Sequence, residues 1–191
     1  MIKTRPVEMI AKATAAIVLT FCTSAAFAAA TWNFNSTYYT GTDGCQVQTS
    51  PNGQQATNSG TFGNTFKCQA TTGTGPTLTV SAWGGQTGVT GFQSGYVSKQ
   101  GGSGFGLASQ AEGISVSAPD HSMDNNPLSG TPDMFLLNFS SAVALDKVTL
   151  GWSQSDADFT LMAYKGSATT AADIVQGKTA SNLTSGGVGA G

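Results

Sequence analysis

Charge is scarce in this sequence of 191 residues. Only 9% of the residues are Asp, Glu, Lys or Arg, where globular domains carry about 25%. Positions 29–191 contain no Arg, one His and five Lys against nine acidic residues, for a net charge of −4. Five scattered lysines cannot neutralise a row of phosphates, which argues against nucleic-acid binding. With so little His, Cys and Arg, most familiar catalytic arrangements cannot be assembled either.

Long hydrophobic runs are also missing. The apolar stretch at residues 13–21 is well short of the roughly 20 residues that a membrane-spanning helix needs. It follows a basic start at Lys3, Arg5 and Lys12, and it precedes a small-x-small pattern over residues 26–28. These features predict a secretory signal peptide over residues 1–28, cleaved after Ala28. We therefore expect export, with no transmembrane helix in the mature chain.

Cysteine is limited to three residues, of which Cys22 lies in the predicted signal peptide. The other two, Cys45 and Cys68, are an even count in an exported chain and predict a disulfide. The bond would close a 24-residue loop and contribute about 3 kcal/mol to stability. The alternatives are two free thiols or half of a metal site, and the absence of a CxxC motif disfavours metal.

Small neutral residues replace the missing charge, since positions 29–191 hold 25 Gly, 22 Thr and 19 Ser. Short apolar alternations recur between turn signals such as Asn52-Gly53 and Gly84-Gly85, and a period of two residues predicts β-strands. The alternating segments are residues 31–35, 77–82, 148–152 and 159–163. Their spacing predicts an all-β fold, an antiparallel β-sandwich of jelly-roll type.

Two segments depart from simple alternation. Residues 134–139 are apolar on both faces, which predicts a central strand that is covered on both sides. Residues 170–176 are the one helical candidate, a short surface helix. We expect a single domain over residues 29–184, incomplete at its C-terminal side, followed by a flexible glycine-rich end over residues 185–191.

Acidic and amide side chains gather in the second half of the chain. Asp120, Asp124, Asn125 and Asp133 offer the oxygen ligands that Ca²⁺ takes, so they are candidates for a calcium site. The alternative is that Asp and Asn close turns by bonding their own backbone, and the spacing does not match the twelve-residue calcium loop. For a catalytic carboxylate pair the chain offers these aspartates and Glu112, its one glutamate after residue 28.

Aromatic residues in glycine-rich stretches suggest a second kind of site. Trp83 and Tyr96 are candidates for stacking on sugars, because exposed rings offer a flat apolar surface. The alternative role for both side chains is packing in the core.

The second half of the chain also carries a family resemblance, over roughly residues 100–170. Five segments together resemble the conserved block of exosortase-dependent surface proteins of the PEP-CTERM class of Gram-negative bacteria: residues 119–125, 133–139, 148–152, 156–158 and 163–166. That family's sorting tail has a Pro-Glu-Pro motif, a hydrophobic helix and a basic cluster, and this sequence contains none of them. An exosortase is therefore an expected partner only if such a tail exists. We also expect the β-sandwich to lack a closing strand, which would leave one strand edge exposed.

The resemblance implies an exported, non-enzymatic protein of the cell surface or extracellular matrix, associated with exopolysaccharide or other surface proteins. The second expectation is a carbohydrate-binding module with a structural calcium. A polysaccharide-degrading enzyme is a distant third.

Overall fold

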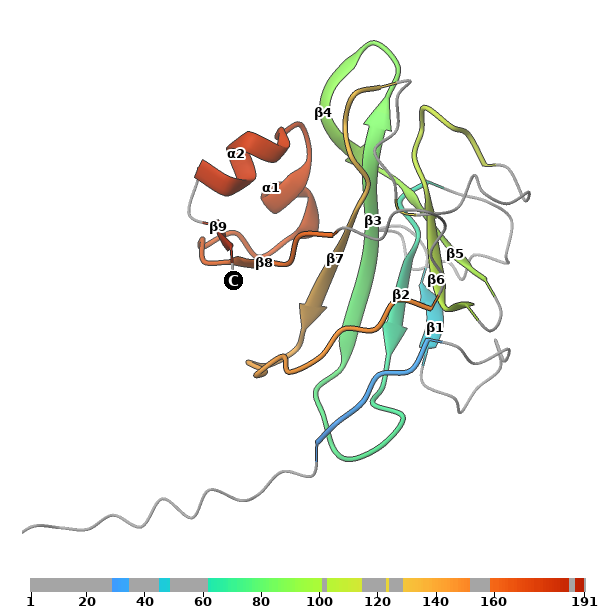
Figure 1. Cartoon of the computed structure of the whole chain (residues 1–191), viewed down its shortest axis with the longest axis vertical. Helices are drawn as coiled ribbons and strands as arrows, with labels where there is room; N and C mark the ends of the chain where they lie inside the picture. Colours follow the sequence, from blue (N-terminus) through green and yellow to red (C-terminus); the bar gives the residue numbers. More distant parts are fainter. Residues whose placement is uncertain are drawn as a thin grey trace, which may run out of the picture.

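The computed structural model describes residues 29–34, 45–48, 62–100, 103–114, 123, 129–151, 159–185 and 188–190. Within them the fold is mostly β, with antiparallel sheets and two short helices, as the all-β expectation requires (Figure 1). The elements follow in the order β1 Cys45–Gln48, β2 Thr65–Cys68, β3 Leu78–Gln86, β4 Val89–Ser94, β5 Tyr96–Lys99, β6 Phe105–Ala108, β7 Met134–Phe139, β8 Met162–Tyr164, α1 Ala171–Val175, α2 Ala180–Ser185 and β9 Val188–Ala190.

Strand β3 organises the main sheet. Along one side it pairs first with β2, which pairs in turn with β1, and then with β4; along its other side it pairs with β7. Alternation explains the strand, since Leu78 and Val80 are 1% exposed while Thr79 between them faces the other way. The β5–β6 hairpin forms a second antiparallel sheet, and β8 pairs with β9, which follows the two helices, to form a third.

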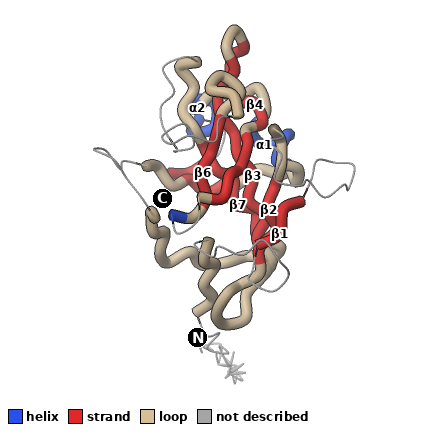
Figure 2. The backbone as a smooth tube through the Cα atoms, turned by 90° about the vertical axis from the view of Figure 1, so that its right-hand side faces the viewer, coloured by secondary structure: helices blue, strands red, loops and turns tan. Residues whose placement is uncertain are grey.

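The two faces of the main sheet carry separate cores. The first, which we call the disulfide-side core, comprises Cys45, Phe66, Cys68, Leu78, Val80, Ala82, Val97 and Leu107. The second, which we call the helix-side core, comprises Trp83, Phe92, Ile174, Val175 and Leu183. Figures 1 and 2 show the consequence, a layered molecule with β5 and β6 on one side of β3 and the helices on the other.

A buried amide attaches the β5–β6 hairpin to the main sheet. The Asn64 side chain is 4% exposed. Its Nδ2 donates to the Val97 carbonyl at 2.8 Å, and its Oδ1 accepts from the Val97 N–H at 2.7 Å. Asn64 therefore makes both hydrogen bonds that a neighbouring strand would make with the Val97 backbone. Its Nδ2 and Oδ1 atoms are buried, and each has a hydrogen-bond partner.

Glycine at position 91 allows the segment that follows α1 to approach β4 closely. The Phe92 N–H donates to the Lys178 carbonyl at 2.9 Å, and the Gly177 N–H donates to the Phe92 carbonyl at 2.8 Å. Beside them Gly91 has φ +83°, and a Cβ there would lie 2.6 Å from the Gly177 carbonyl carbon. Only glycine combines that dihedral with that approach.

Both helices begin with a side-chain cap. The predicted helix at 170–176 is confirmed as α1, where Thr170 Oγ1 accepts from the Asp173 N–H at 3.1 Å. Helix α2 was not predicted, although Thr179 Oγ1 accepts from the Asn182 N–H and the Thr179 N–H donates to Asn182 Oδ1. That reciprocal pattern is a variant of the capping box and is readable from sequence.

Several strand predictions need correction. Residues 148–151 form no strand, and of residues 31–34 only Thr31 makes a β-bridge, with Thr72. The strand predicted over 159–163 begins later, as β8. Within the expected flexible end, Val188–Ala190 form β9 and pair with β8.

Strand β7 is covered on both faces, as expected, but it is not central among the described strands. Phe135, Leu137 and Phe139 pack on the disulfide-side core, while Met134 and Leu136 pack on the helix-side core. Within the described residues its sole ladder partner is β3, so it lies at an edge among the described strands. A run that is apolar on both faces predicts that both faces of the strand are covered. It does not predict how many strands pair with it in the sheet.

No helix in the described part of the chain is long and apolar enough to cross a membrane.

Candidate functional site

The predicted disulfide is present. Cys45 and Cys68 are directly opposite each other in the β1–β2 ladder, with their sulfur atoms 2.06 Å apart. They are 6% and 0% exposed, so the bond is part of the disulfide-side core. It joins β1 to the rest of the sheet across the polar segment between the two strands.

Of the four calcium candidates, Asp133 alone lies within the described residues; Asp120, Asp124 and Asn125 lie outside them. Asp133 directly precedes β7 and is 8% exposed. Its carboxylate lies against Gly84 of β3, where an added Cβ would be 2.5 Å from Asp133 Oδ1 and 2.6 Å from Ser109 Cβ. The described residues contain no group of three His, Cys, Asp or Glu side chains that could hold a metal ion, so calcium binding stays a prediction.

Glu112 has a structural role beside this position. Its Oε2 accepts from the Ser109 N–H at 2.8 Å and from the Ser109 hydroxyl at 2.9 Å. The Glu112 and Gly113 N–H groups donate to the Ser109 carbonyl in turn. The carboxylate therefore closes the turn that follows β6.

The two aromatic candidates occupy different environments. Trp83 is 5% exposed in the helix-side core, and its Nε1 donates to Ser81 Oγ at 2.9 Å. This position gives Trp83 the packing role that the sequence left open as its alternative. Tyr96 at the start of β5 is half-buried, and burial raises the pKa of its hydroxyl. A ligand contact at Tyr96 stays a prediction.

Sequence reasoning missed a polar surface on the main sheet, on the face that carries the helix-side core. The helix layer packs on Trp83, Met134 and Leu136. Beyond those residues the same face carries four directly opposed side chains, one from each of β1, β2, β3 and β7; we call them the polar row: Gln46, Lys67, Thr79 and Asn138. Gln46, Lys67 and Asn138 are exposed and Thr79 is half-buried.

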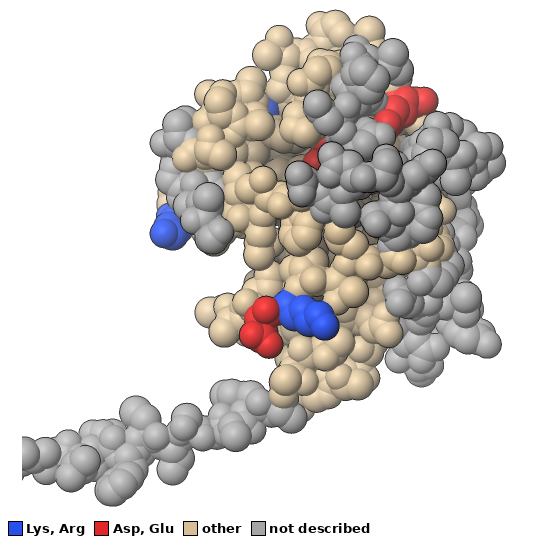
Figure 3. Space-filling view, viewed as in Figure 1, with Lys and Arg blue, Asp and Glu red and all other residues tan. Residues whose placement is uncertain are grey.

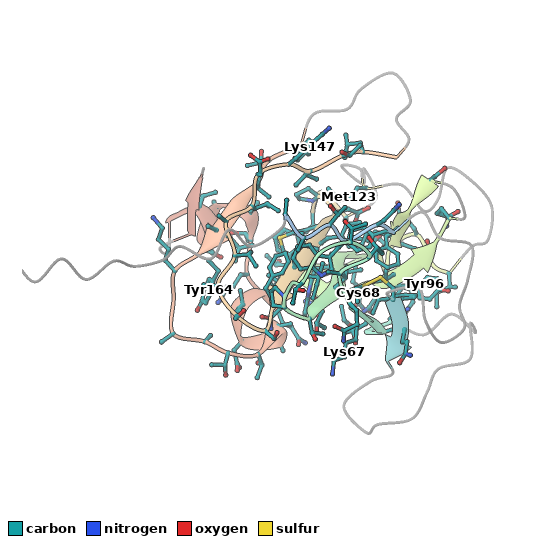
Figure 4. The ribbon with its side chains drawn as sticks, turned by 90° about the horizontal axis from the view of Figure 1, so that it is seen from below. Lys67, Cys68, Tyr96, Met123, Lys147 and Tyr164 are labelled. Carbon is teal, nitrogen blue, oxygen red and sulfur yellow. A yellow bond between two sulfur atoms is a disulfide. The ribbon has the colours of Figure 1, made fainter. Side chains whose placement is uncertain are left out.

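A second line of polar side chains extends this surface. Gln69 Nε2 donates to Thr77 Oγ1 at 3.2 Å, and the Thr77 N–H donates to Ser140 Oγ at 3.0 Å. Lys67 points away from the core in which Cys68 lies, and Lys147 lies on the opposite side of the molecule (Figure 4). The signal for this surface was present in the sequence of each strand, as a polar residue between two apolar ones. The pairing that aligns the four strands was not.

Charge is sparse on the folded surface as well. On the face that Figure 3 shows, the described surface carries few Lys, Asp and Glu side chains, and one basic side chain lies beside an acidic one. Residues 29–191 contain five lysines, and Lys67 is the one that lies in the polar row.

Comparison with known proteins identifies no relative: no family model, no curated protein and no solved structure matches this chain.

Proposed function

We propose that this protein is an exported, non-enzymatic component of the cell surface or extracellular matrix of a Gram-negative bacterium. The observation that supports the proposal best is the buried Cys45–Cys68 bond between paired strands. Disulfides form and persist in oxidising compartments and are rare in the cytosol. The predicted signal peptide, the low charge and the resemblance to exosortase-dependent surface proteins favour the same role.

For the fold we propose a β-sandwich of jelly-roll type. Val97 of β5 and Leu107 of β6 are both 0% exposed and pack against the disulfide-side face of the main sheet. This stacking of one antiparallel sheet on another is the arrangement of a sandwich.

Cell fractionation tests the exported role. The full chain, expressed in a Gram-negative host, should be found outside the cytoplasm, shortened at Ala28 and with its disulfide formed. A variant with Ala26→Leu and Ala28→Leu, which replaces both small residues of the predicted cleavage site, should keep its N-terminal segment. Accumulation of the unmodified chain in the cytoplasm, at full length and with reduced cysteines, would overturn the proposal.

A carbohydrate-binding module is the second candidate, and the polar row favours it. This candidate includes a structural calcium at Asp120, Asp124, Asn125 and Asp133. A cation that binds only the native state raises the melting temperature. Equal melting temperatures in excess Ca²⁺ and in chelator would contradict the calcium, independently of any glycan binding.

A further inference from the structure

The polar row is shaped to follow an extended polymer. Its side chains come from four neighbouring strands and share one face, because directly opposed residues in antiparallel strands point the same way. Neighbouring strands lie about 4.8 Å apart, close to the rise per sugar along an extended polysaccharide. A glycan running across the strands would therefore meet one polar side chain at each successive sugar.

The chemistry of the row suits hydroxyl-rich ligands. The Gln46 and Asn138 amides each offer donors and an acceptor, and the Thr79 hydroxyl offers both. Within the described part of the chain, no side-chain hydrogen bond or ion pair involves the Lys67 ammonium or the Asn138 amide. These groups are available to replace the water that a sugar hydroxyl loses on binding.

The positive charge of Lys67 favours acidic polysaccharides over neutral ones. Lys67 is the one charged residue in the row, and the adjoining Gln69, Thr77 and Ser140 add no acidic group. Residues 29–191 otherwise carry a net negative charge, which opposes binding of anions elsewhere. A carboxylate next to the ammonium gains a charge-assisted hydrogen bond, stronger than one between neutral groups.

We propose that the polar row binds an extended acidic polysaccharide, with its chain running across β1, β2, β3 and β7 and a uronate carboxylate on the Lys67 ammonium. The proposal deepens the second candidate function, and it rests on the exported role for the compartment in which the ligand is met. The contacts are non-covalent. Gln46 and Thr79 flank the charged contact at Lys67, and the Asn138 amide lies beyond Thr79.

Affinity electrophoresis of the purified full chain in gels containing polygalacturonate tests the proposal, with gels containing neutral dextran for comparison. Polygalacturonate should slow the protein more than dextran does. Lys67→Ala should weaken binding to polygalacturonate about tenfold, because it removes a charge-assisted contact. Lys147→Ala changes the net charge equally on the opposite side of the molecule and should leave binding within about twofold, the result expected of a residue outside the site.

Asn138→Ala provides a second measurement that does not alter charge. It should weaken binding by about threefold, as expected for the loss of one neutral hydrogen bond. All three substituted side chains are exposed, so the variants should melt together with the parent chain. Failure of polygalacturonate to retard the parent, or equal losses in the two lysine variants, would overturn the proposal. Neither result depends on where the protein resides, so fractionation and electrophoresis can fail independently.

Discussion

The two cores lie on opposite faces of the same sheet but are closed by different means. The disulfide-side core is enclosed by strands and by a covalent bond between β1 and β2. The helix-side core is closed by two helices of five and six residues, which are too short to be stable in isolation. The disulfide-side core is therefore held by a covalent bond within it. The helix-side core depends on the helix caps and on the backbone hydrogen bonds that join Phe92 of β4 to Gly177 and Lys178.

The largest expected effect comes from removing the disulfide. Cys45→Ala with Cys68→Ala should lower the free energy of unfolding by about 3 kcal/mol, because the unfolded chain regains the entropy of the closed loop. For a chain of this size the melting temperature should fall by about 10 °C, as measured by circular dichroism. Reduction of the parent chain with dithiothreitol is the matched control and should reproduce the shift; an unchanged melting temperature in both would show that the bond carries no stability.

The second largest effect is expected from Gly91→Ala, which should destabilise the helix-side core. The substitution places a Cβ at a positive φ and 2.6 Å from the Gly177 carbonyl carbon, at a cost of about 2 kcal/mol. Hydrogen exchange should show the loss first at Gly177 and in α1 and α2, before β2 and β3. Gly88→Ala is the matched control: Gly88 has a positive φ too, but a Cβ there meets nothing within 4 Å. Equal destabilisation by the two variants would show that the close approach has no effect of its own.

Loss of the α1 cap should have a smaller effect in the same region. Thr170→Ala removes the acceptor for the Asp173 N–H and should cost about 1 kcal/mol. Thr170→Ser keeps the hydroxyl and should recover most of the difference in urea unfolding. A serine variant as unstable as the alanine variant would locate the effect in the threonine methyl group and not in the cap.

The smallest expected effect is a pH dependence on the other side of the sheet. Burial raises the pKa of Tyr96 above its ordinary value of about 10. As the pH rises through 10, the unfolded chain loses this proton first, so stability should fall between the unfolded pKa and the higher folded pKa. Tyr96→Phe should flatten this alkaline slope in melts at pH 9 to 11, and a slope equal to that of the parent chain would contradict the prediction.

Sequence periodicity predicted the faces of the sheet better than its order. Alternation at residues 77–82 identified β3, and the apolar run at 134–139 identified a strand covered on both sides. The position of β7 beside β3 could not be read from that run, because β3 lies more than fifty residues earlier. The alternation at 148–151 predicted a strand that does not form, and Val148 and Leu150 are 39% and 44% exposed. Period two is necessary for a half-buried strand, but pairing depends on a partner elsewhere in the chain.

Some of the candidate sites could likewise be predicted from the sequence, and others required the structure. The disulfide followed from a count of cysteines and the predicted export. Burial decided the role of Trp83, and no pattern within its own strand specified that the helices would cover it. The polar row required the register of three separate ladders, which local sequence does not encode.

The pairing of Cys45 with Cys68 also fixes which side chains share a face. Shifting β1 by one residue against β2 would exchange its inward and outward side chains, so Gln46 would turn toward the core and Cys45 toward solvent. The covalent bond forbids that slip at the one pair it joins, and Gln46 is the next residue along β1, opposite Lys67. A bond buried on one face of the sheet thereby sets the alignment of the surface on the other face.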